Sequence, residues 1–242
     1  AGVSKDDEVL VPTITFVATI NAVIYVNANP IFFDSDDYLN LDLVSLDSFL
    51  KKNTFFKNGY THNKKTKKKI KAIIATHVFG NCCDITKLKI MCYNRNIKII
   101  EDAAESLGSF IEKNKLKNHS GTMSLIGCFS FNGNKIITSG GGGAIVTNNL
   151  KIFEKAKYLI NQAKDKSINF IHNDVGYNYR MSNLHAAVGY TQLKKIKYIL
   201  KKKKDINKYY RLQIDKINGL SLIENPSYSN SNNWLNILKI DN

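Results

Sequence analysis

Residues 70–102 have the sequence IKAIIATHVFGNCCDITKLKIMCYNRNIKIIED, and the architecture of the chain follows from this segment. Ile70 to Thr76 is rich in β-branched residues and predicts a strand. Ile85 to Tyr93 has apolar residues at helical spacing, and Ile97 to Ile100 predicts a second strand that ends at Asp102. A strand, a helix and a strand at this spacing form a βαβ unit, whose two strands run parallel. The predicted fold class is therefore α/β, with a mostly parallel sheet flanked by helices.

The sequence on both sides of this segment continues the alternation of strands and helices. Further strands are predicted at Glu8 to Val11, Pro30 to Phe33, Ser124 to Phe131 and Ala144 to Val146. Helices are predicted at Thr13 to Val26, Leu43 to Leu50, Leu150 to Ala163 and Ser182 to Leu200, with another from Asp205 onward. We expect Thr13 or Thr15 to cap the first helix and Ser182 to cap the long one. The Lys- and Asn-rich residues 51–69 predict a loop or a hairpin arm.

The charge of the chain is strongly positive and admits two interpretations. The 242 residues suffice for one large α/β domain and carry a net charge of +15, much of it in residues 51–71 and 194–208. A basic surface can bind nucleic acid or an anionic membrane, but these runs lack interleaved aromatic residues that stack on single strands. Because Lys, Asn and Ile are abundant throughout, we favour biased codon composition and expect no nucleic-acid or membrane partner. An anionic small substrate is compatible with this charge, and a non-catalytic polyanion-binding protein is the alternative.

The cysteines and the hydropathy indicate a reduced, cytoplasmic protein. Cys82, Cys83, Cys92 and Cys128 form no C-x-x-C pair, so they are a poor framework for disulfides or zinc, and we expect no metal site. Lys or Asn interrupts every apolar stretch before it reaches membrane-spanning length, and no signal peptide opens the chain. Since Ala1 comes first and a strand follows almost at once, we expect a fragment or a processed product.

Lys135 and Asp102 are the residues at which we expect the chemistry. Lys135 follows a short apolar run and precedes four glycines, Gly140 to Gly143, whereas most other lysines stand in runs typical of solvated surface. A lysine amine held in a pocket can form a Schiff base. Ligands of open parallel sheets bind beyond the carboxyl ends of strands, and both residues come just after predicted strands. A Schiff-base lysine with an Asp facing a pyridinium nitrogen is the arrangement of a pyridoxal phosphate site.

Each candidate also has a plainer interpretation. An acidic residue after a buried strand, such as Asp102, is often only a helix cap. His77 has no partner at ligand spacing and is more often structural, and Cys128 is more often a small core residue than a nucleophile. Phe16 is a core residue by default, and the turn that contains Asn178 can recognise an anion or cap the next helix. The glycine run leads into a strand and matches no nucleotide-binding fingerprint, so nucleotide hydrolysis is not supported.

The most specific motifs occur in order along nearly the whole chain. They are Val9 to Phe16 with Ala18-Thr19, His77 to Gly80, Glu101 to Ser106, Ser130 to Lys135 with its glycine run, and Gly176 to Ala187. Together they resemble the sugar aminotransferases of the DegT/DnrJ/EryC1/StrS family. The resemblance implies a pyridoxal phosphate-dependent fold type I large domain over residues 1–205, with its N-terminal part missing. It also implies the truncated start of a small C-terminal domain over residues 206–242.

The resemblance implies a role for each candidate residue. Lys135 would bond to pyridoxal phosphate and shuttle a proton, Asp102 would pair with the pyridine nitrogen, and Phe16 would stack on the ring. Ser130 would contact the cofactor phosphate. Asn178 would reach the phosphate in the neighbouring subunit, which implies a homodimer with shared active sites.

A further acidic residue, Glu105, departs from the commonest pattern of the family. Many relatives have Gln at this position, near the hydroxyl group of the cofactor ring, and a carboxylate there alters the local charge. Family members are also longer at both ends, and a Ser/Gly-Thr phosphate-binding turn normally precedes the position of Ala1. The resemblance therefore implies activity for the longer family members and does not extend it to this chain.

Within the family, the chain most resembles enzymes that aminate UDP-linked 4-keto-6-deoxy-N-acetylhexosamines of bacillosamine- and legionaminic acid-type pathways. Phe55 to Gly59 is part of that resemblance. We expect transamination of such a nucleotide sugar for cell-surface polysaccharide biosynthesis, with L-glutamate as the amino donor. Perosamine-type enzymes that act on GDP-4-keto-6-deoxymannose are the alternative. Sugar dehydratases on the same fold have His in place of the lysine, so Lys135 argues against that activity.

Overall fold

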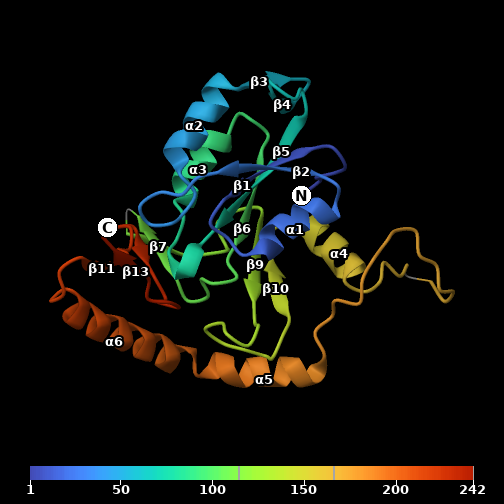
Figure 1. Cartoon of the computed structure of the whole chain (residues 1–242). Helices are drawn as coiled ribbons and strands as arrows, with labels where there is room; N and C mark the ends of the chain where they lie inside the picture. The colour runs from blue at the N-terminus through green and yellow to red at the C-terminus, as the bar shows by residue number, and fades with distance from the viewer. Residues whose placement is uncertain (114, 166, 242) are drawn as a thin grey trace.

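An eight-stranded sheet forms the centre of the structure, a computed structural model that describes residues 1–113, 115–165 and 167–241 (Figure 1). Its main path has the spatial order β10 (Gly143–Val146), β9 (Ile126–Ser130), β6 (Lys98–Asp102), β5 (Lys69–Thr76), β1 (Glu8–Pro12) and β2 (Asn29–Phe33). A hairpin of β3 (Thr54–Lys57) and β4 (Tyr60–Asn63) joins β5 antiparallel, so the predicted hairpin arm is confirmed. On the main path every pair is parallel except β9 and β10. The predicted α/β class with a mostly parallel sheet is therefore confirmed.

Helices cover both faces of this sheet. The helices of the structure are α1 (Val17–Tyr25), α2 (Leu43–Lys52), α3 (Ile85–Cys92), α4 (Leu150–Leu159), α5 (Asn183–Lys194) and α6 (Ile196–Ile214), with a 3-10 turn η1 (Val78–Gly80) after β5; α1, α2 and α3 supply the cores on the two faces. On one face Leu46 of α2 and Leu88 of α3 share a core with Ile73 of β5. On the other face Val23 of α1 packs in a core with Ile74. Successive strand residues point to opposite faces, so neighbouring residues of β5 serve two different cores.

The C-terminal part of the chain lies beside the sheet and returns to it. Its strand β12 (Ser229–Asn230) pairs with β7 (Phe110–Lys113), which forms a hairpin with β8 (Leu116–His119), and its strands β11 (Leu220–Leu222) and β13 (Leu238–Ile240) form a second small antiparallel sheet. α5 and α6 run below the main sheet in Figure 1. Leu200 of α6 packs with Ile136 and Trp234 in a third apolar cluster. The predicted domain division at residue 205 stays a prediction, and α6 passes through that residue without a break.

The first helix begins later than predicted. The amide of Thr13 donates to the carbonyl of Phe33 at 2.8 Å, which keeps the chain extended beyond β1 and delays α1 until Val17. The prediction that Thr13 or Thr15 caps this helix was wrong. The cap position is Phe16, and no side chain caps α1 among the described contacts. Thr15 instead contacts the hydroxyl of Thr19 at 2.8 Å.

The long helix predicted from Ser182 to Leu200 is two helices. The chain leaves helical geometry at Lys195, where φ is −96° and ψ is 1°, and α6 continues to Ile214. The second helix predicted from Asp205 is therefore part of α6. The break redirects the chain so that Ile196 and Leu200 reach the third apolar cluster. Ser182 does cap α5, as predicted, since its hydroxyl accepts from the amide of His185 at 3.3 Å.

Two further differences concern short elements. α4 ends at Leu159 and not at Ala163, because Gln162 and Ala163 adopt positive φ angles of 60° and 50° and turn the chain. The β7–β8 hairpin was not predicted, since its four-residue strands carry little hydrophobic alternation. Within the described ranges, no helix combines the length and the apolar character needed to cross a bilayer.

The carboxylate of Glu101, at 0% exposure, ties the end of β6 to the loop that leads into β9. Its Oε2 lies 3.0 Å from Nε2 of His77 and accepts from the amide of Gly121 at 2.7 Å. Its Oε1 accepts from the amides of residues 123 and 124 at 2.8 and 2.7 Å. The amide of Cys83 donates to Nδ1 of His77 at 3.1 Å, which assigns the proton of a neutral imidazole to Nε2. The structural interpretation of His77 therefore agrees with its contacts.

We expect Glu101→Ala to lower the free energy of unfolding by about 3–5 kcal/mol at pH 7, because it leaves several buried donors without a partner. Burial by itself raises the pKa of the Glu101 carboxyl, but hydrogen bonds, led by that of His77, bring the pKa below its ordinary value of 4.5. A lowered carboxyl pKa stabilises the fold above the ordinary pKa, and this stability is lost as pH falls through the folded-state pKa. The variant should therefore lose part of the acid dependence of unfolding.

Urea unfolding between pH 3 and pH 7 measures both effects. The control is Glu112→Ala, which removes an exposed carboxylate 3.2 Å from Nζ of Lys117. Equal stabilities of the Glu101 and Glu112 variants would show that the buried network contributes little.

Candidate functional site

Asp102 and Lys135 lie at the same edge of the sheet. Strands β6 and β9 are parallel neighbours, with Asp102 in register with Cys128. Asp102 is the last residue of β6, and Lys135 follows the end of β9 in a turn in which its amide donates to the carbonyl of Asn132 at 3.1 Å. The placement beyond the carboxyl ends of parallel strands agrees with the expected position of a ligand site.

The carboxylate of Asp102 is oriented by α1, a helix near the N-terminus of the chain. Thr19 of α1 donates its hydroxyl to Oδ2 at 2.6 Å, and the amide of Ala104 donates to Oδ1 at 3.1 Å. Thr19 is itself buried and lies 2.8 Å from the hydroxyl of Thr15. The carboxylate therefore has a fixed direction. Thr19 belongs to one of the motifs of the sequence, but this long-range contact was not predicted.

The amine of Lys135 is held in a nearly closed environment. Its Nζ lies 3.6 Å from Oε1 of Glu105, and both side chains are only 13% exposed. The same Nζ lies 4.2 Å from the centroid of the Trp234 ring. Lysine side chains are mostly exposed in proteins, so this environment distinguishes Lys135 from the surface lysines of the chain. Trp234 was not identified from the sequence, because nothing in its local sequence links it to a residue about 100 positions earlier.

Glu105 contacts the amine of Lys135 and lies within the electrostatic influence of Asp102. Its Oε2 accepts from the amide of Phe79 at 2.7 Å. Burial raises the pKa of the Glu105 carboxyl and the charge of Asp102 adds to that rise, while the amide of Phe79 and the charge of Lys135 oppose it. Lys135 touches Glu105, and Asp102 is near enough to shift its pKa. The structure therefore brings the three predicted residues Asp102, Glu105 and Lys135 to one place.

The other predicted site residues are placed differently. Phe16 is 71% exposed, so its default interpretation as a core residue was wrong, and its ring face is free of the described cores. Ser130 ends β9, where its hydroxyl accepts from the amide of Asn132 at 3.3 Å. Asn178 is exposed and forms an isolated bridge with Asn161, on the segment that leads from α4 to α5. None of the hydrogen bonds described for Asn178 goes to the surroundings of Lys135.

Cys128 is not poised as a nucleophile. It lies on β9 opposite Asp102 and is partly buried. Burial raises the pKa of its thiol to about 11, and the charge of Asp102 acts in the same direction. The thiol is therefore protonated at neutral pH, whereas only the thiolate attacks efficiently.

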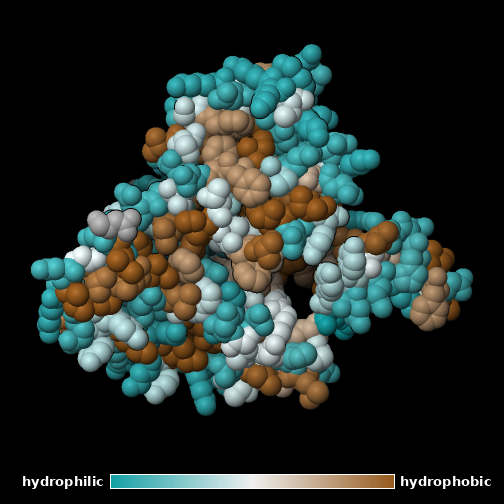
Figure 2. Space-filling view, in the orientation of Figure 1, coloured by the Kyte–Doolittle hydropathy of each residue, from teal (hydrophilic) through white to brown (hydrophobic). Residues whose placement is uncertain are grey.

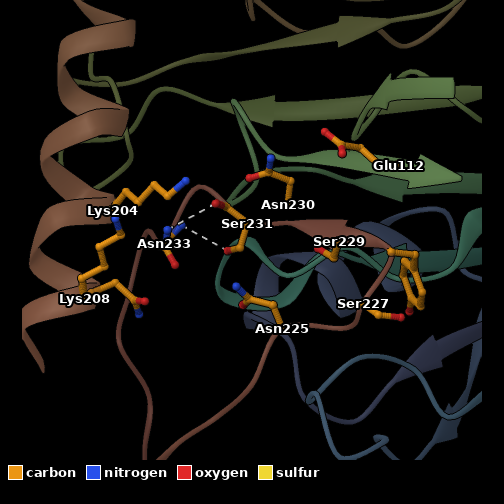
Figure 3. Close-up of a pocket in the computed structure, with 11 residues that line it drawn as sticks. Glu112, Lys204, Lys208, Asn225, Ser227, Ser229, Asn230, Ser231 and Asn233 are labelled. Atoms are coloured by element: carbon orange, nitrogen blue, oxygen red, sulfur yellow. Dashed lines mark hydrogen bonds between the residues drawn. The ribbon is translucent and has the colours of Figure 1, made fainter. Parts of the chain in front are cut away.

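A polar cavity of about 420 Å³ lies elsewhere, between α6 and the segment around β12 (Figure 3). Lys204 and Lys208 project toward it from α6, and Ser227, Ser229 and Ser231 line its other side. None of the predicted site residues lines this cavity. Its lining is rich in hydroxyl and amide groups and carries two lysines and Glu112.

Comparison with known proteins identifies the family. Residues 1–242 match the model of the DegT/DnrJ/EryC1/StrS aminotransferase family. The chain belongs to this family. It is similar to EpsN of Bacillus subtilis, with 36% identity over 99% of the chain and 58% of that protein. GDP-perosamine synthase of Vibrio cholerae is 36% identical over 88% of the chain and 53% of its own length.

A relative named for a different sugar has a comparable similarity. UDP-4-amino-4,6-dideoxy-N-acetyl-beta-L-altrosamine transaminase of Campylobacter jejuni is 31% identical over 96% of the chain and 57% of that protein. The chain thus spans a little over half of the length of the curated relatives it matches. This family assignment agrees with the resemblance found from the motifs.

Solved structures of the family support the fold. A DegT/DnrJ/EryC1/StrS aminotransferase from Brucella abortus superposes with a TM-score of 0.87 at 24% identity, covering 100% of the chain and 61% of that structure. Helicobacter pylori PseC, an aminotransferase involved in the biosynthesis of pseudoaminic acid, superposes with a TM-score of 0.84 at 23% identity, covering 99% of the chain and 60% of that structure. The predicted fold of the large domain is therefore confirmed.

The residues at the sheet edge fit pyridoxal phosphate, the cofactor that the family implies. Such a site requires an amine for the aldehyde, a carboxylate for the pyridine nitrogen and donors for the phosphate. The nearly buried amine of Lys135 and the doubly anchored carboxylate of Asp102 supply the first two. The hydroxyl of Ser130 lies at the end of β9, and the exposed ring of Phe16 lies directly before α1. This donor set matches the chemistry of the group.

We expect Glu105→Gln to become more stable relative to the parent chain as pH rises. Because the folded state raises the pKa of Glu105, the protonated form is favoured at low pH, and that stability is lost as pH rises through the folded-state pKa. Gln stays neutral and does not incur this loss. Melting temperatures of both chains at pH 4 and pH 8 measure the effect.

A matched control for this comparison is Glu154→Gln, at an exposed position on α4. Its melting temperature should follow that of the parent chain at both pH values. A Glu105→Gln difference that is the same at pH 4 and pH 8 would mean that Glu105 titrates as it does in the unfolded chain.

Proposed function

We propose that the protein to which this chain belongs transfers an amino group from L-glutamate to the keto carbon of a nucleotide-linked 4-keto-6-deoxy sugar, with pyridoxal phosphate as its cofactor. The observation that carries the proposal is the nearly buried amine of Lys135, 3.6 Å from Glu105 at the edge where Asp102 ends β6. Membership of an aminotransferase family supports the same reaction. Restricted exposure protects a reactive amine from water and other reagents.

The residues of the chain have separate tasks in this proposal. Nζ of Lys135 would hold the cofactor through a covalent bond, and once freed it would accept the Cα proton of the amino acid as a general base and donate a proton as a general acid. The carboxylate of Asp102, which Thr19 keeps aimed in one direction, would pair with the protonated pyridine nitrogen. When bound, the protonated ring supplies a sink for the electron pair left at the Cα. Glu105 places a carboxyl group 3.6 Å from the amine.

The proposed sugar substrate is UDP-linked and N-acetylated. The transaminase from Campylobacter jejuni, whose name contains such a sugar, supports this choice. A GDP-linked 4-keto-6-deoxy sugar is the second candidate, favoured by the 36% identity to GDP-perosamine synthase of Vibrio cholerae. A net charge of +15 attracts either anionic substrate and does not discriminate between them. Turnover of matched UDP- and GDP-linked keto sugars by the full-length protein separates the two.

A homodimer with shared sites is part of the proposal. Large apolar side chains are exposed on the segment from α4 to α5, including Phe170 at 81% and Leu184 at 82%. Figure 2 shows further apolar residues, in brown, scattered over one face of the molecule. Large apolar side chains exposed on one segment suit burial against a second copy of the chain. Asn178 lies on the same exposed segment and has no described bond near Lys135 of its own chain, which suits a contribution to the site of a second copy.

Lys135→Ala should abolish covalent cofactor binding and transamination. The parent chain with added pyridoxal phosphate should develop a visible absorbance band that borohydride removes, because borohydride reduces the bond between amine and aldehyde. The variant should develop no such band, and the full-length variant should lose activity by a factor of at least about 10³, as expected when the group that forms the covalent bond is removed.

The control is Lys71→Ala, which removes a lysine stacked over Tyr60 away from the site. It should keep the band and the activity. Transamination retained by Lys135→Ala would rule out the assigned role of this residue. A parent chain with no band, but with steeply salt-dependent nucleic-acid binding, would favour the polyanion-binding alternative.

A further inference from the structure

The only tryptophan of the chain contacts the turn of Lys135 in two ways. The indole N–H of Trp234 donates to the carbonyl of Asn134 at 2.7 Å, so it holds the backbone directly before Lys135. The face of the same ring lies 4.2 Å from Nζ of Lys135. One side chain therefore restrains both the backbone and the amine of the proposed reactive lysine.

Trp234 is itself held in place by apolar packing. It is 6% exposed and shares a cluster with Ile136 and Ile137, which directly follow Lys135. Phe79 stacks on it with ring centroids 6.4 Å apart. Because its surroundings exclude water, the attraction between an ammonium group and the ring is stronger than at an exposed site.

The backbone around Trp234 is bonded to the loop that follows Asp102. The side-chain amide of Asn232, at 3% exposure, donates to the carbonyls of Glu105 and Leu107 at 2.9 and 3.0 Å. Its Oδ1 accepts from the amide of Trp234 at 2.9 Å. A Cβ at Gly80 would lie 2.0 Å from this Oδ1, so the close approach of the segment requires glycine there. Residues 231–234 are thus fixed to the same loop that carries Glu105.

We propose that Trp234 is a positioning residue for Lys135, and that it holds the amine at the sheet edge through its ring and the preceding turn through its N–H. The inference rests on the proposed function, in which Lys135 is the reactive amine. A free lysine side chain samples many rotamers, and a fixed ring beside Nζ reduces that number before the cofactor arrives. The contribution comes from the C-terminal segment, about 100 residues beyond Lys135 in the chain.

Two variants separate the contacts. Trp234→Leu removes both the aromatic face and the N–H donor, whereas Trp234→Phe keeps an aromatic face and loses only the bond to Asn134. After addition of pyridoxal phosphate, the borohydride-sensitive band reports the condensation of the Lys135 amine with the aldehyde, which releases water. We expect Trp234→Leu to slow the appearance of this band by about 3- to 30-fold, from the magnitude of a desolvated cation–π contact. Trp234→Phe should slow it less.

The matched control is Leu235→Ala, which changes the next residue of the same segment at a position that is 43% exposed. It should leave the rate of band formation unchanged. An equal rate for Trp234→Leu and the parent chain would overturn the inference and leave the proposed function standing. Absence of the band from the parent chain itself would remove the proposed function, and the inference with it.

Fluorescence tests the contact without cofactor and without changing Trp234. Since the chain has one tryptophan, its emission reports the surroundings of this ring alone. Lys135→Met should shift or brighten that emission, because it removes a charge next to the indole. Lys71→Met, which removes a lysine 4.3 Å from the ring of Tyr60, should not. Emission from Lys135→Met that superimposes on the parent spectrum would overturn the inference even if Trp234→Leu fails to fold.

Discussion

The buried carboxylate of Glu101 is the constraint on which the edge of this sheet depends. It gathers one imidazole N–H and backbone amides from the loop that enters β9, so it fixes how β6 and β9 meet. The next residue, Asp102, points to the opposite face, because side chains alternate along a strand. One acidic residue of the pair therefore builds the edge, and its neighbour is presented toward α1 and the proposed site.

The site is assembled from segments that are far apart in sequence. Thr19 orients Asp102 from α1, Glu105 follows β6, Lys135 follows β9 and Trp234 arrives from the C-terminal segment. Each contact alone is modest, since a hydrogen bond or a cation–π contact contributes on the order of 1 kcal/mol. Their joint effect is geometric, because every one of them restrains a group that would otherwise rotate freely.

The paired carboxyl groups near Lys135 are kept chemically distinct by their surroundings. Asp102 accepts hydrogen bonds from Thr19 and from the amide of Ala104, which fix its direction. Burial, together with the charge of Asp102, raises the pKa of the Glu105 carboxyl. One carboxyl group is thus oriented at the end of β6, and the other binds a proton more readily beside an amine.

The local sequence determined much of the fold. It also identified two of the three residues that meet at the sheet edge, Asp102 and Lys135. Apolar and β-branched runs alternating with helical spacings predicted the parallel sheet. The positions of Asp102 and Lys135 just after predicted strands pointed to these two residues, and Glu105 came from the family resemblance. Element ends and the break at Lys195 were missed, because the bond from Thr13 to Phe33 and the packing of Leu200 are non-local.

Tertiary structure alone decided the surroundings of the amine. A sequence pattern reports the periodicity of neighbours, but it does not report which distant residues become neighbours when the chain folds. The contacts of Thr19 with Asp102 and of Trp234 with Lys135 span 83 and about 100 residues, and they exist only because the sheet edge and the returning C-terminal segment meet in space.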